Sequence, residues 1–219
     1  MATPLLISID GNIGAGKTTV LNALREACPD LHLVKEPVQE WMQMNDAKGK
    51  NILELFYSDI ERWAYTFQHV TLMTRINNTT EVLKKVEGTN AVVVMERSIL
   101  TDRHVFAEML KKQGKLNPLE WDLYTRWYDL LTGFMPVDGI IHVNTDVETC
   151  IQRIAARARP GEVTPVEYLN DLHEAHEEWL SDASHPVLTL STTDGSNEAE
   201  RVAKIVQFLD ELREKRSNT

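Results

Sequence analysis

The stretch that decides the fold of this 219-residue chain is Gly11-Asn12-Ile13-Gly14-Ala15-Gly16-Lys17-Thr18. It follows the apolar run of residues 5–9 and leads into an amphipathic segment, so it is expected to connect a strand to a helix. Glycines there let successive backbone N–H groups point at one anion, and the helix N-terminus adds the positive end of its dipole. Lys17 can reach the β- and γ-phosphates, and Thr18 can bind Mg²⁺. Together with the adjacent Thr19, this phosphate loop predicts a site for a nucleoside triphosphate.

Length, charge and cysteine content narrow the class of protein. With 219 residues and 42% hydrophobic content, the chain suits a single compact domain over residues 1–219. A net charge of −10 argues against binding to a nucleic acid polymer or to an anionic membrane surface. The two cysteines, Cys28 and Cys150, lie far apart, which favours reduced thiols. No apolar run has the length of a membrane span, and the early phosphate loop leaves no room for a leader, so we expect a cytoplasmic protein.

Short apolar runs alternate with helical patterns along the chain. Strands are predicted at residues 5–9, 31–35, 90–95, 139–143 and 187–190. Helices are predicted near 16–28, 59–86, 98–113, 118–132, 146–157, 165–180 and 197–213. This alternation predicts a doubly wound α/β fold, in which a parallel five-stranded sheet has helices on both faces. Ligands should then bind at the carboxyl edge of the sheet.

Charged side chains follow two of the predicted strands at that edge. Glu36 comes directly after the second strand, and Glu96-Arg97-Ser98 follows the third. A carboxylate there can accept a proton from an attacking hydroxyl, a second can support Mg²⁺, and an arginine can neutralise charge on the transferred group. Taken singly, each carboxylate could equally be a solvated strand end. Their common position at the ligand edge favours phosphoryl transfer.

Arginines gather at the end of one predicted helix. Arg153, Arg157 and Arg159 lead into a Pro160-Gly161 connection between two helices. Such side chains can form a lid, about residues 153–163, that closes over a triphosphate. The alternative is that they only complement the helix dipole. In an acidic chain with a phosphate loop, the lid is the better interpretation.

Several separated motifs resemble one enzyme family. They are the phosphate loop, Glu36-Pro37 up to Trp41, Tyr57 ahead of the segment 61–68, the run from Glu96-Arg97-Ser98 to Asp102-Arg103, and the arginine lid. In order and spacing they are similar to the deoxyribonucleoside kinases related to deoxycytidine and deoxyguanosine kinase, a group with the P-loop NTPase fold. The resemblance covers residues 5 to about 190. It implies transfer of the γ-phosphate of ATP to the 5′-hydroxyl of a deoxyribonucleoside, with Mg²⁺ as cofactor.

The resemblance also implies roles for individual residues. Glu36 would be the base, Arg97 its charge-stabilising partner beside Lys17, and Glu96 would support Mg²⁺ with Thr18. The expected nucleoside pocket consists of Tyr57 and Glu162 at the sugar 3′-hydroxyl, Gln68 at the base edge, and Trp41, Phe67 and Phe106 along the base faces. Relatives pair through long helices, so a homodimer through residues 59–86 and 118–132 is expected.

Helical spacing adds a prediction about the base. Thr71 and Arg75 follow Gln68 by three and seven residues, so all three can line one pocket. A buried arginine needs a counter-charge, and Asp102 is the natural candidate. Asp102 can accept a hydrogen bond from an exocyclic amino group, while Arg75 can donate to a ring nitrogen or carbonyl. This favours deoxycytidine, deoxyadenosine or deoxyguanosine over thymidine.

Two rival functions share the phosphate loop. A thymidylate-kinase-like enzyme would need a pocket for a substrate phosphate, where Glu36 places repulsive negative charge. A nucleotide-dependent switch would need no acceptor, and the chain has no guanine-reading Asn-Lys-x-Asp. The acceptor pocket therefore favours the nucleoside kinase.

Overall fold

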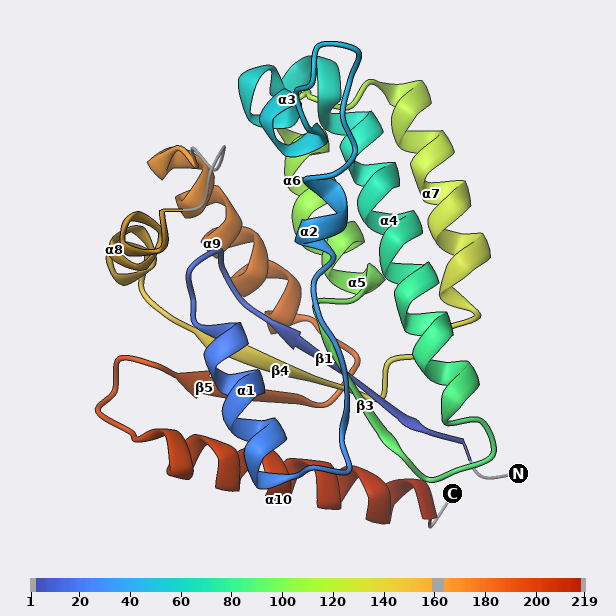
Figure 1. Cartoon of the computed structure of the whole chain (residues 1–219), viewed down its shortest axis with the longest axis vertical. Coiled ribbons are helices and arrows are strands. Elements are labelled where there is room, and N and C mark those ends of the chain that lie inside the picture. The colour runs from blue at the N-terminus through green and yellow to red at the C-terminus, as the bar shows by residue number, and fades with distance from the viewer. Residues whose placement is uncertain (1–2, 159–163, 218–219) are drawn as a thin grey trace.

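The computed structural model describes residues 3–158 and 164–217, and the five strands in this part of the chain form one parallel sheet (Figure 1). The strand order is β2-β3-β1-β4-β5, with bounds Leu5–Asp10 (β1), His32–Val34 (β2), Val92–Glu96 (β3), Gly139–Asn144 (β4) and Val187–Ser191 (β5). Each strand lies within two residues of its predicted position, and the predicted α/β fold is confirmed. β1 is central, so the loop that follows it emerges at the middle of the carboxyl edge.

Helices cover both faces of this sheet. Helices α1 and α10 lie against one face, and α4, α5, α6, α7 and α9 gather on the other (Figure 1). Their bounds are Lys17–Ala27 (α1), Val38–Trp41 (α2), Ile52–Ser58 (α3), Ile60–Lys85 (α4), Ile99–Thr101 (α5), Asp102–Ala107 (η1, a π-helix), Glu108–Lys112 (α6), Pro118–Thr132 (α7), Val147–Arg157 (α8), Val166–Ser181 (α9) and Glu198–Ser217 (α10).

Alternate strand residues build two separate cores. Leu6 and Val93 point into the core beneath α4 and α9, whereas Ile7 and Val94 point into the core beneath α1 and α10. Because successive side chains of a strand project to opposite faces, a sheet that is covered on both sides needs apolar residues at every position. This requirement explains the uninterrupted apolar runs that predicted the strands.

Two short helices were missed by the sequence prediction, which left residues 36–58 without regular structure. Helix α3 begins with a capping box that the sequence does carry, because Asn51 and Glu54 exchange side-chain and backbone hydrogen bonds of 3.0 and 2.9 Å. Helix α2 follows Pro37 and spans only four residues, which is too short for a periodic pattern. Both helices matter because they carry residues of the site.

The segment predicted as one helix over 98–113 is instead three consecutive helical pieces. Its middle piece, η1, is a π-helix, in which each turn is wider than in an α-helix. Sequence periodicity cannot distinguish the two, since the difference is about one residue per turn. Such bulges commonly occur at functional sites, and η1 carries two residues of the cavity described below, Asp102 and Phe106.

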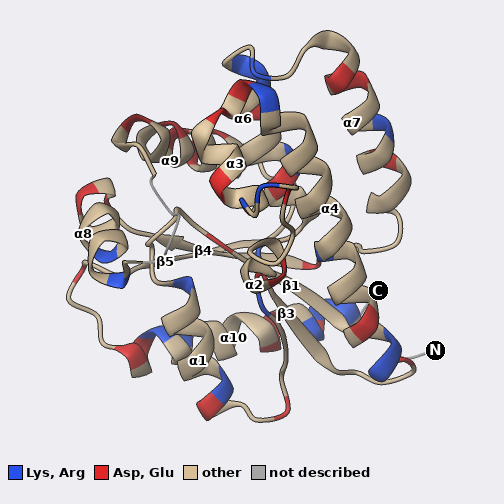
Figure 2. Cartoon of the chain, turned by 45° about the horizontal axis from the view of Figure 1, so that its top comes forward, with Lys and Arg blue, Asp and Glu red and all other residues tan. Residues whose placement is uncertain are grey.

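Charged positions lie mainly on the helices and loops, while the strands are largely uncharged (Figure 2). No helix within residues 3–158 and 164–217 is long and apolar enough to cross a membrane.

Two buried histidines give the folded chain a predicted sensitivity to acid. The rings of His142 on β4 and His176 on α9 stack at 6.0 Å, and both side chains are buried. Burial lowers the pKa of His142 from 6.5 to about 4 and lowers the pKa of His176 well below 6.5. The unfolded chain therefore binds these protons at a higher pH than the folded chain, so stability is lost as the pH falls below 6.5.

We expect the free energy of unfolding to fall between pH 7 and pH 5, with about 2 kcal/mol of the loss due to His142. Urea titrations across this range measure it. The variant His142→Gln should show a shallower dependence on pH, whereas replacing the exposed His32 by glutamine should leave the dependence unchanged. An unaltered slope in His142→Gln would contradict the assignment.

Candidate active site at the carboxyl edge of the sheet

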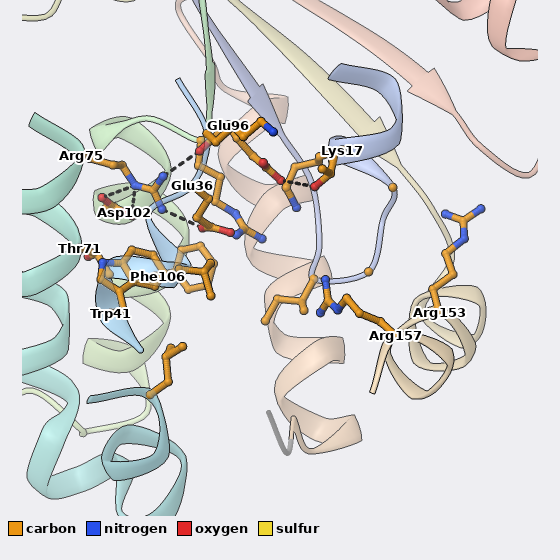
Figure 3. A pocket seen from close by; sticks show the side chains of 18 of the residues that line it. Lys17, Glu36, Trp41, Thr71, Arg75, Glu96, Asp102, Phe106, Arg153 and Arg157 are labelled. Carbon is orange, nitrogen blue, oxygen red and sulfur yellow. Dashed lines mark hydrogen bonds and ion pairs between the residues drawn. The ribbon is translucent and has the colours of Figure 1, made fainter. Parts of the chain in front are cut away.

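One cavity of about 650 Å³ runs along the carboxyl edge from the phosphate loop to helix α4. Figure 3 shows its two sides, with Arg75, Asp102, Trp41 and Phe106 on one and Lys17, Arg153 and Arg157 on the other. Most of the predicted site residues line it: Ile13, Gly14, Gly16, Lys17, Thr18, Thr19, Glu36, Trp41, Tyr57, Phe67, Gln68, Thr71, Arg75, Glu96, Arg97, Asp102, Phe106, Arg153 and Arg157.

The remaining loop residues Gly11, Asn12 and Ala15 are buried and shape the phosphate loop from behind. Gly11 has φ 143°, and a Cβ there would lie 2.5 Å from the carbonyl oxygen of Val143, so no other residue fits. The Asn12 amide donates to the carbonyl of Leu169 at 2.9 Å, which connects the loop to α9. The loop thus depends on glycine for its path and on α9 for its position.

Lys17 begins α1 and is almost completely buried beneath the loop. Its Nζ donates to the carbonyl oxygens of Gly11 at 2.9 Å and Asn12 at 2.8 Å. Burial, followed by repulsion from Arg97, lowers the pKa of Lys17 to about 7. Phosphate anions bound in the loop would favour the charged form and oppose this shift.

Two side chains whose oxygen atoms can bind a metal ion lie next to the phosphate loop. The Thr18 hydroxyl donates to Oε1 of Glu96 at 2.9 Å, which joins the first turn of α1 to the end of β3. Hydroxyl and carboxylate oxygens are the ligands that hard divalent cations prefer. The side chains of this pair therefore suit Mg²⁺.

Glu36 lies at the centre of the cavity between two arginines. Its Oε1 accepts from Arg97 Nη1 at 2.6 Å and from Arg75 Nη2 at 3.0 Å. Burial alone would raise the pKa of Glu36, but the guanidinium groups of Arg97 and Arg75 outweigh it and hold the pKa well below its usual range. Both arginines bind Oε1, so within the described residues Oε2 remains the oxygen that can accept from a ligand.

Arg97 connects this carboxylate to the phosphate loop. Besides binding Glu36, it donates from Nη2 to the carbonyl of Gly11 at 3.1 Å, and its guanidinium lies 5.0 Å from the centre of the Phe106 ring. Its backbone φ is 63°, a left-handed conformation that is unusual for a residue with a Cβ. The arginine is therefore held from several sides at the point where the loop meets Glu36.

The predicted ion pair between Arg75 and Asp102 is confirmed. Arg75 Nε lies 3.0 and 2.9 Å from the two carboxylate oxygens of Asp102, and Nη1 donates to the carbonyl of Glu96 at 2.8 Å. Burial raises the pKa of Asp102 to about 6, against the opposing effect of Arg75. The sequence prediction did not include the third partner of Arg75, which is Glu36.

Gln68, Thr71 and Arg75 line the cavity together, as their helical spacing predicted. Gln68 is buried, and its Oε1 has no hydrogen-bond partner among the residues described. Because buried carbonyl oxygens are normally paired, this atom is available to a ligand. The Thr71 hydroxyl donates to the main-chain carbonyl oxygen of Gln68 at 2.9 Å. The methyl group of Thr71 is therefore left to contact a ligand.

Aromatic side chains enclose the same end of the cavity. The rings of Trp41 and Phe67 meet edge to face at 5.4 Å, and the indole N–H of Trp41 donates to Thr74 at 3.0 Å. Phe106 completes the predicted aromatic lining, and Tyr57, predicted at the sugar 3′-hydroxyl, also lines the cavity. A flat aromatic ligand fits such walls.

Sequence reasoning missed Leu53, Phe56 and Tyr168, which also line the cavity. Phe56 lies 4.7 Å from Phe67 and 6.3 Å from Tyr168 between ring centres. The capping box of α3 could have indicated the helix that carries Leu53 and Phe56. No local signal marks Tyr168, which reaches the cavity only because α9 packs beside the loop.

Of the three arginines predicted to form a lid, the structure describes Arg153 and Arg157. Arg153 and Arg157 extend from α8 to the cavity, and Arg153 Nη1 donates to the carbonyl of Ala15 at 2.9 Å and to Thr192 at 3.1 Å. The predicted site residues Arg159 and Glu162 lie outside the described residues. Arg153 and Arg157 thus add two positive charges to that of Lys17 on the phosphate-loop side of the cavity.

Comparison with known proteins agrees with this geometry. A family model described as deoxynucleoside kinase matches residues 7–213. The chain is 35% identical to a probable deoxycytidine kinase of Fowlpox virus (strain NVSL), with 94% of this chain and 88% of the relative covered. It is 34% identical to the deoxycytidine kinase of Homo sapiens (94% and 91% covered) and 33% identical to the mitochondrial deoxyguanosine kinase of Xenopus laevis (80% and 72% covered). The chain therefore belongs to the deoxynucleoside kinase family and is a nucleoside phosphotransferase.

Proposed function

We propose that the enzyme transfers the γ-phosphate of ATP to the 5′-hydroxyl of a deoxyribonucleoside, with deoxycytidine and the purine deoxynucleosides preferred over thymidine. The observation that carries this proposal is the position of Glu36, between the phosphate loop and the wall formed by Gln68, Arg75 and Asp102. A nucleoside whose 5′-hydroxyl lies at Glu36 would direct this hydroxyl toward the phosphates. Its nucleobase would lie against the wall on the other side.

In this proposal Glu36 accepts the proton of the attacking hydroxyl. Its depressed pKa keeps it ionised at every physiological pH, and Oε2 is the acceptor atom. Arg97 holds the carboxylate and offers positive charge where the phosphoryl group passes. Lys17, Arg153 and Arg157 supply further positive charge at the triphosphate, and the two arginines would form the lid together with Arg159.

Base preference in this proposal follows from charge and hydrogen bonding. The Asp102 carboxylate would accept from an exocyclic amino group, and Arg75 would donate to the neighbouring ring nitrogen. Thymidine offers a carbonyl oxygen and a ring N–H instead, so acceptor would face acceptor and donor would face donor. Gln68 can pair with either kind of base edge, since its amide both donates and accepts.

We further propose that Mg²⁺ accompanies ATP and is held by Thr18 and Glu96. Their 2.9 Å contact brings a hydroxyl and a carboxylate together at the first turn of α1, which fits a hard cation. When bound, the cation would neutralise charge on the phosphates. Tyr57 and Glu162 are proposed to hold the sugar 3′-hydroxyl.

The test is ADP release with MgATP and, in parallel, deoxycytidine, deoxyadenosine, deoxyguanosine, thymidine and thymidine monophosphate. Turnover with nucleosides but not with the monophosphate is expected, with thymidine the poorest nucleoside. Turnover with the monophosphate alone would favour a thymidylate-kinase-like activity and overturn the role of Glu36. Hydrolysis that no acceptor accelerates would indicate a switch.

We also propose a homodimer that forms through α7 and α4. Five exposed apolar residues form one stripe along α7 and the turn after it: Leu119, Leu123, Trp127, Leu130 and Phe134. Met73 of α4 is exposed as well. Exposed apolar stripes of this length mark protein interfaces, and a second copy would present the same stripe in return.

Replacing Trp127 with glutamate is therefore expected to convert a dimer to a monomer, because a buried unpaired carboxylate is costly. Light scattering after size-exclusion chromatography measures the mass. The matched control is Lys204→Glu on α10, an exposed position on the opposite side of the sheet, which should remain dimeric. A wild-type chain that is monomeric at micromolar concentration would refute the interface.

A further inference from the structure

The backbone of Arg97 is held in an unfavourable conformation by its surroundings. Its φ of 63° is left-handed, and Ala158 is the other non-glycine residue with positive φ in the described part of the chain. A residue with a Cβ keeps this conformation only where neighbouring contacts determine it, and such residues cluster at active sites.

Both peptide groups that flank the Arg97 Cα are anchored. The preceding one is held because the Arg97 N–H donates to the carbonyl of Ile9 at 3.0 Å. The following one is held because the Ser98 N–H donates to the Thr101 hydroxyl at 3.1 Å. The rotations φ and ψ turn these two groups about the Cα, so anchoring both of them sets the conformation of Arg97.

The second anchor rests on Asp10, the last residue of β1. The Thr101 hydroxyl accepts from Ser98 and donates to Oδ1 of Asp10, while the Ser8 hydroxyl donates to Oδ2 at 2.6 Å. Ser8, Asp10 and Thr101 are all completely buried. A carboxylate can only accept, so it directs the single hydroxyl proton of Thr101 toward itself and leaves the lone pairs for Ser98.

We propose that Asp10 and Thr101 are positioning residues, which hold Arg97 in its left-handed conformation so that its guanidinium reaches both Glu36 and the Gly11 carbonyl. This inference rests on the proposed role of Glu36 and Arg97 in the transfer step. Without the Thr101 anchor, the peptide after Arg97 is free to rotate toward a favourable conformation. The guanidinium, at the far end of a long side chain, then moves away from Glu36. Displacements of about 1 Å in such groups cost about 10²-fold in rate.

The first test compares three threonine variants. Thr101→Val keeps the shape but loses the hydroxyl, and it is expected to lower kcat by about 10- to 100-fold with little change in the KM of deoxycytidine. Thr101→Ser retains the hydroxyl and should recover most of kcat. The control is Thr79→Val, which also removes a buried threonine hydroxyl, but from α4. It should keep the wild-type kcat.

A second test separates positioning from a general loss of structure. In an Arg97→Ala background, Thr101→Val should cause no further fall in kcat, because a residue that acts through Arg97 has nothing left to position. A fall by the same factor as in the wild type would show that Thr101 acts independently and would overturn the inference. The same double-mutant cycle, with Asp10→Asn in place of Thr101→Val, tests whether the Asp10 carboxylate also acts through Arg97.

Different outcomes would contradict the proposed function and the positioning role of Thr101. A wild-type enzyme without nucleoside-dependent ADP release would refute the proposed function, and wild-type turnover of Arg97→Ala would refute the role of Arg97 in the transfer step, whatever Thr101 does. A strong loss in Arg97→Ala together with wild-type turnover of Thr101→Val would leave the proposed function standing and refute only the positioning role. Melting temperatures of all variants, measured alongside, verify that each is folded at the assay temperature.

Discussion

Replacing Glu36 with glutamine is expected to lower kcat by about 10²- to 10⁴-fold, the usual cost of removing a positioned general base. The amide is nearly isosteric and can still accept from Arg97 and Arg75 through its oxygen, so the cavity should keep its shape. It cannot take up the proton of a hydroxyl at physiological pH. The KM of the nucleoside should therefore change much less than kcat.

Steady-state ADP release and the direct binding of deoxycytidine measure these two effects separately. The matched control is Glu40→Gln, since Glu40 lies four residues after Glu36, on α2, but contacts Asn78 rather than the cavity. It should behave like the wild type. Turnover of Glu36→Gln within a few fold of the wild type would exclude Glu36 as the base, and another acceptor would have to be sought.

The double variant Arg75→Met with Asp102→Ala is expected to raise the ratio of kcat/KM for thymidine over deoxycytidine by about 10²-fold or more. In the wild type, the carboxylate of Asp102 and the guanidinium of Arg75 would face the thymine carbonyl and N–H with the wrong polarity. An apolar wall removes that mismatch and also removes the partners that deoxycytidine uses.

Both residues must change together. Arg75→Met alone would leave Asp102 as a buried, unpaired carboxylate, which costs about 3–5 kcal/mol of stability when its partner is lost. Arg75 also binds Glu36, so the double variant should lose turnover with every nucleoside. The ratio of the two substrates cancels this common loss, which makes it the quantity to measure.

A second ion pair from the same segment provides the control. Arg103 binds Glu108 at 2.7 Å, and neither residue lines the cavity. The double variant Arg103→Met with Glu108→Ala should leave the preference between thymidine and deoxycytidine unchanged. An unchanged preference in the Arg75 and Asp102 double variant would place base selection elsewhere in the pocket, with Thr71 and Gln68 as the next positions to vary.

Local sequence was sufficient for the sheet, the long helices and the phosphate loop. Continuous apolar runs predict strands that are buried on both faces, and the glycine spacing of residues 11–16 permits only one kind of loop. The carboxylates at positions 36 and 96 could be placed at the ligand edge because parallel strands bring their carboxyl ends together. These features depend on neighbours within a few residues, which is what a sequence pattern records.

Only the tertiary structure decided how the charged residues share their partners. Arg75 lies 39 residues from Glu36 and 27 from Asp102 along the chain, yet its guanidinium binds both. The left-handed backbone of Arg97, its anchor through Thr101 to Asp10, and the approach of Tyr168 all depend on how α4, α5 and α9 pack against the sheet. Each contact forms within about 3–4 Å. Helix packing sets distances on that scale, whereas spacing along the sequence does not.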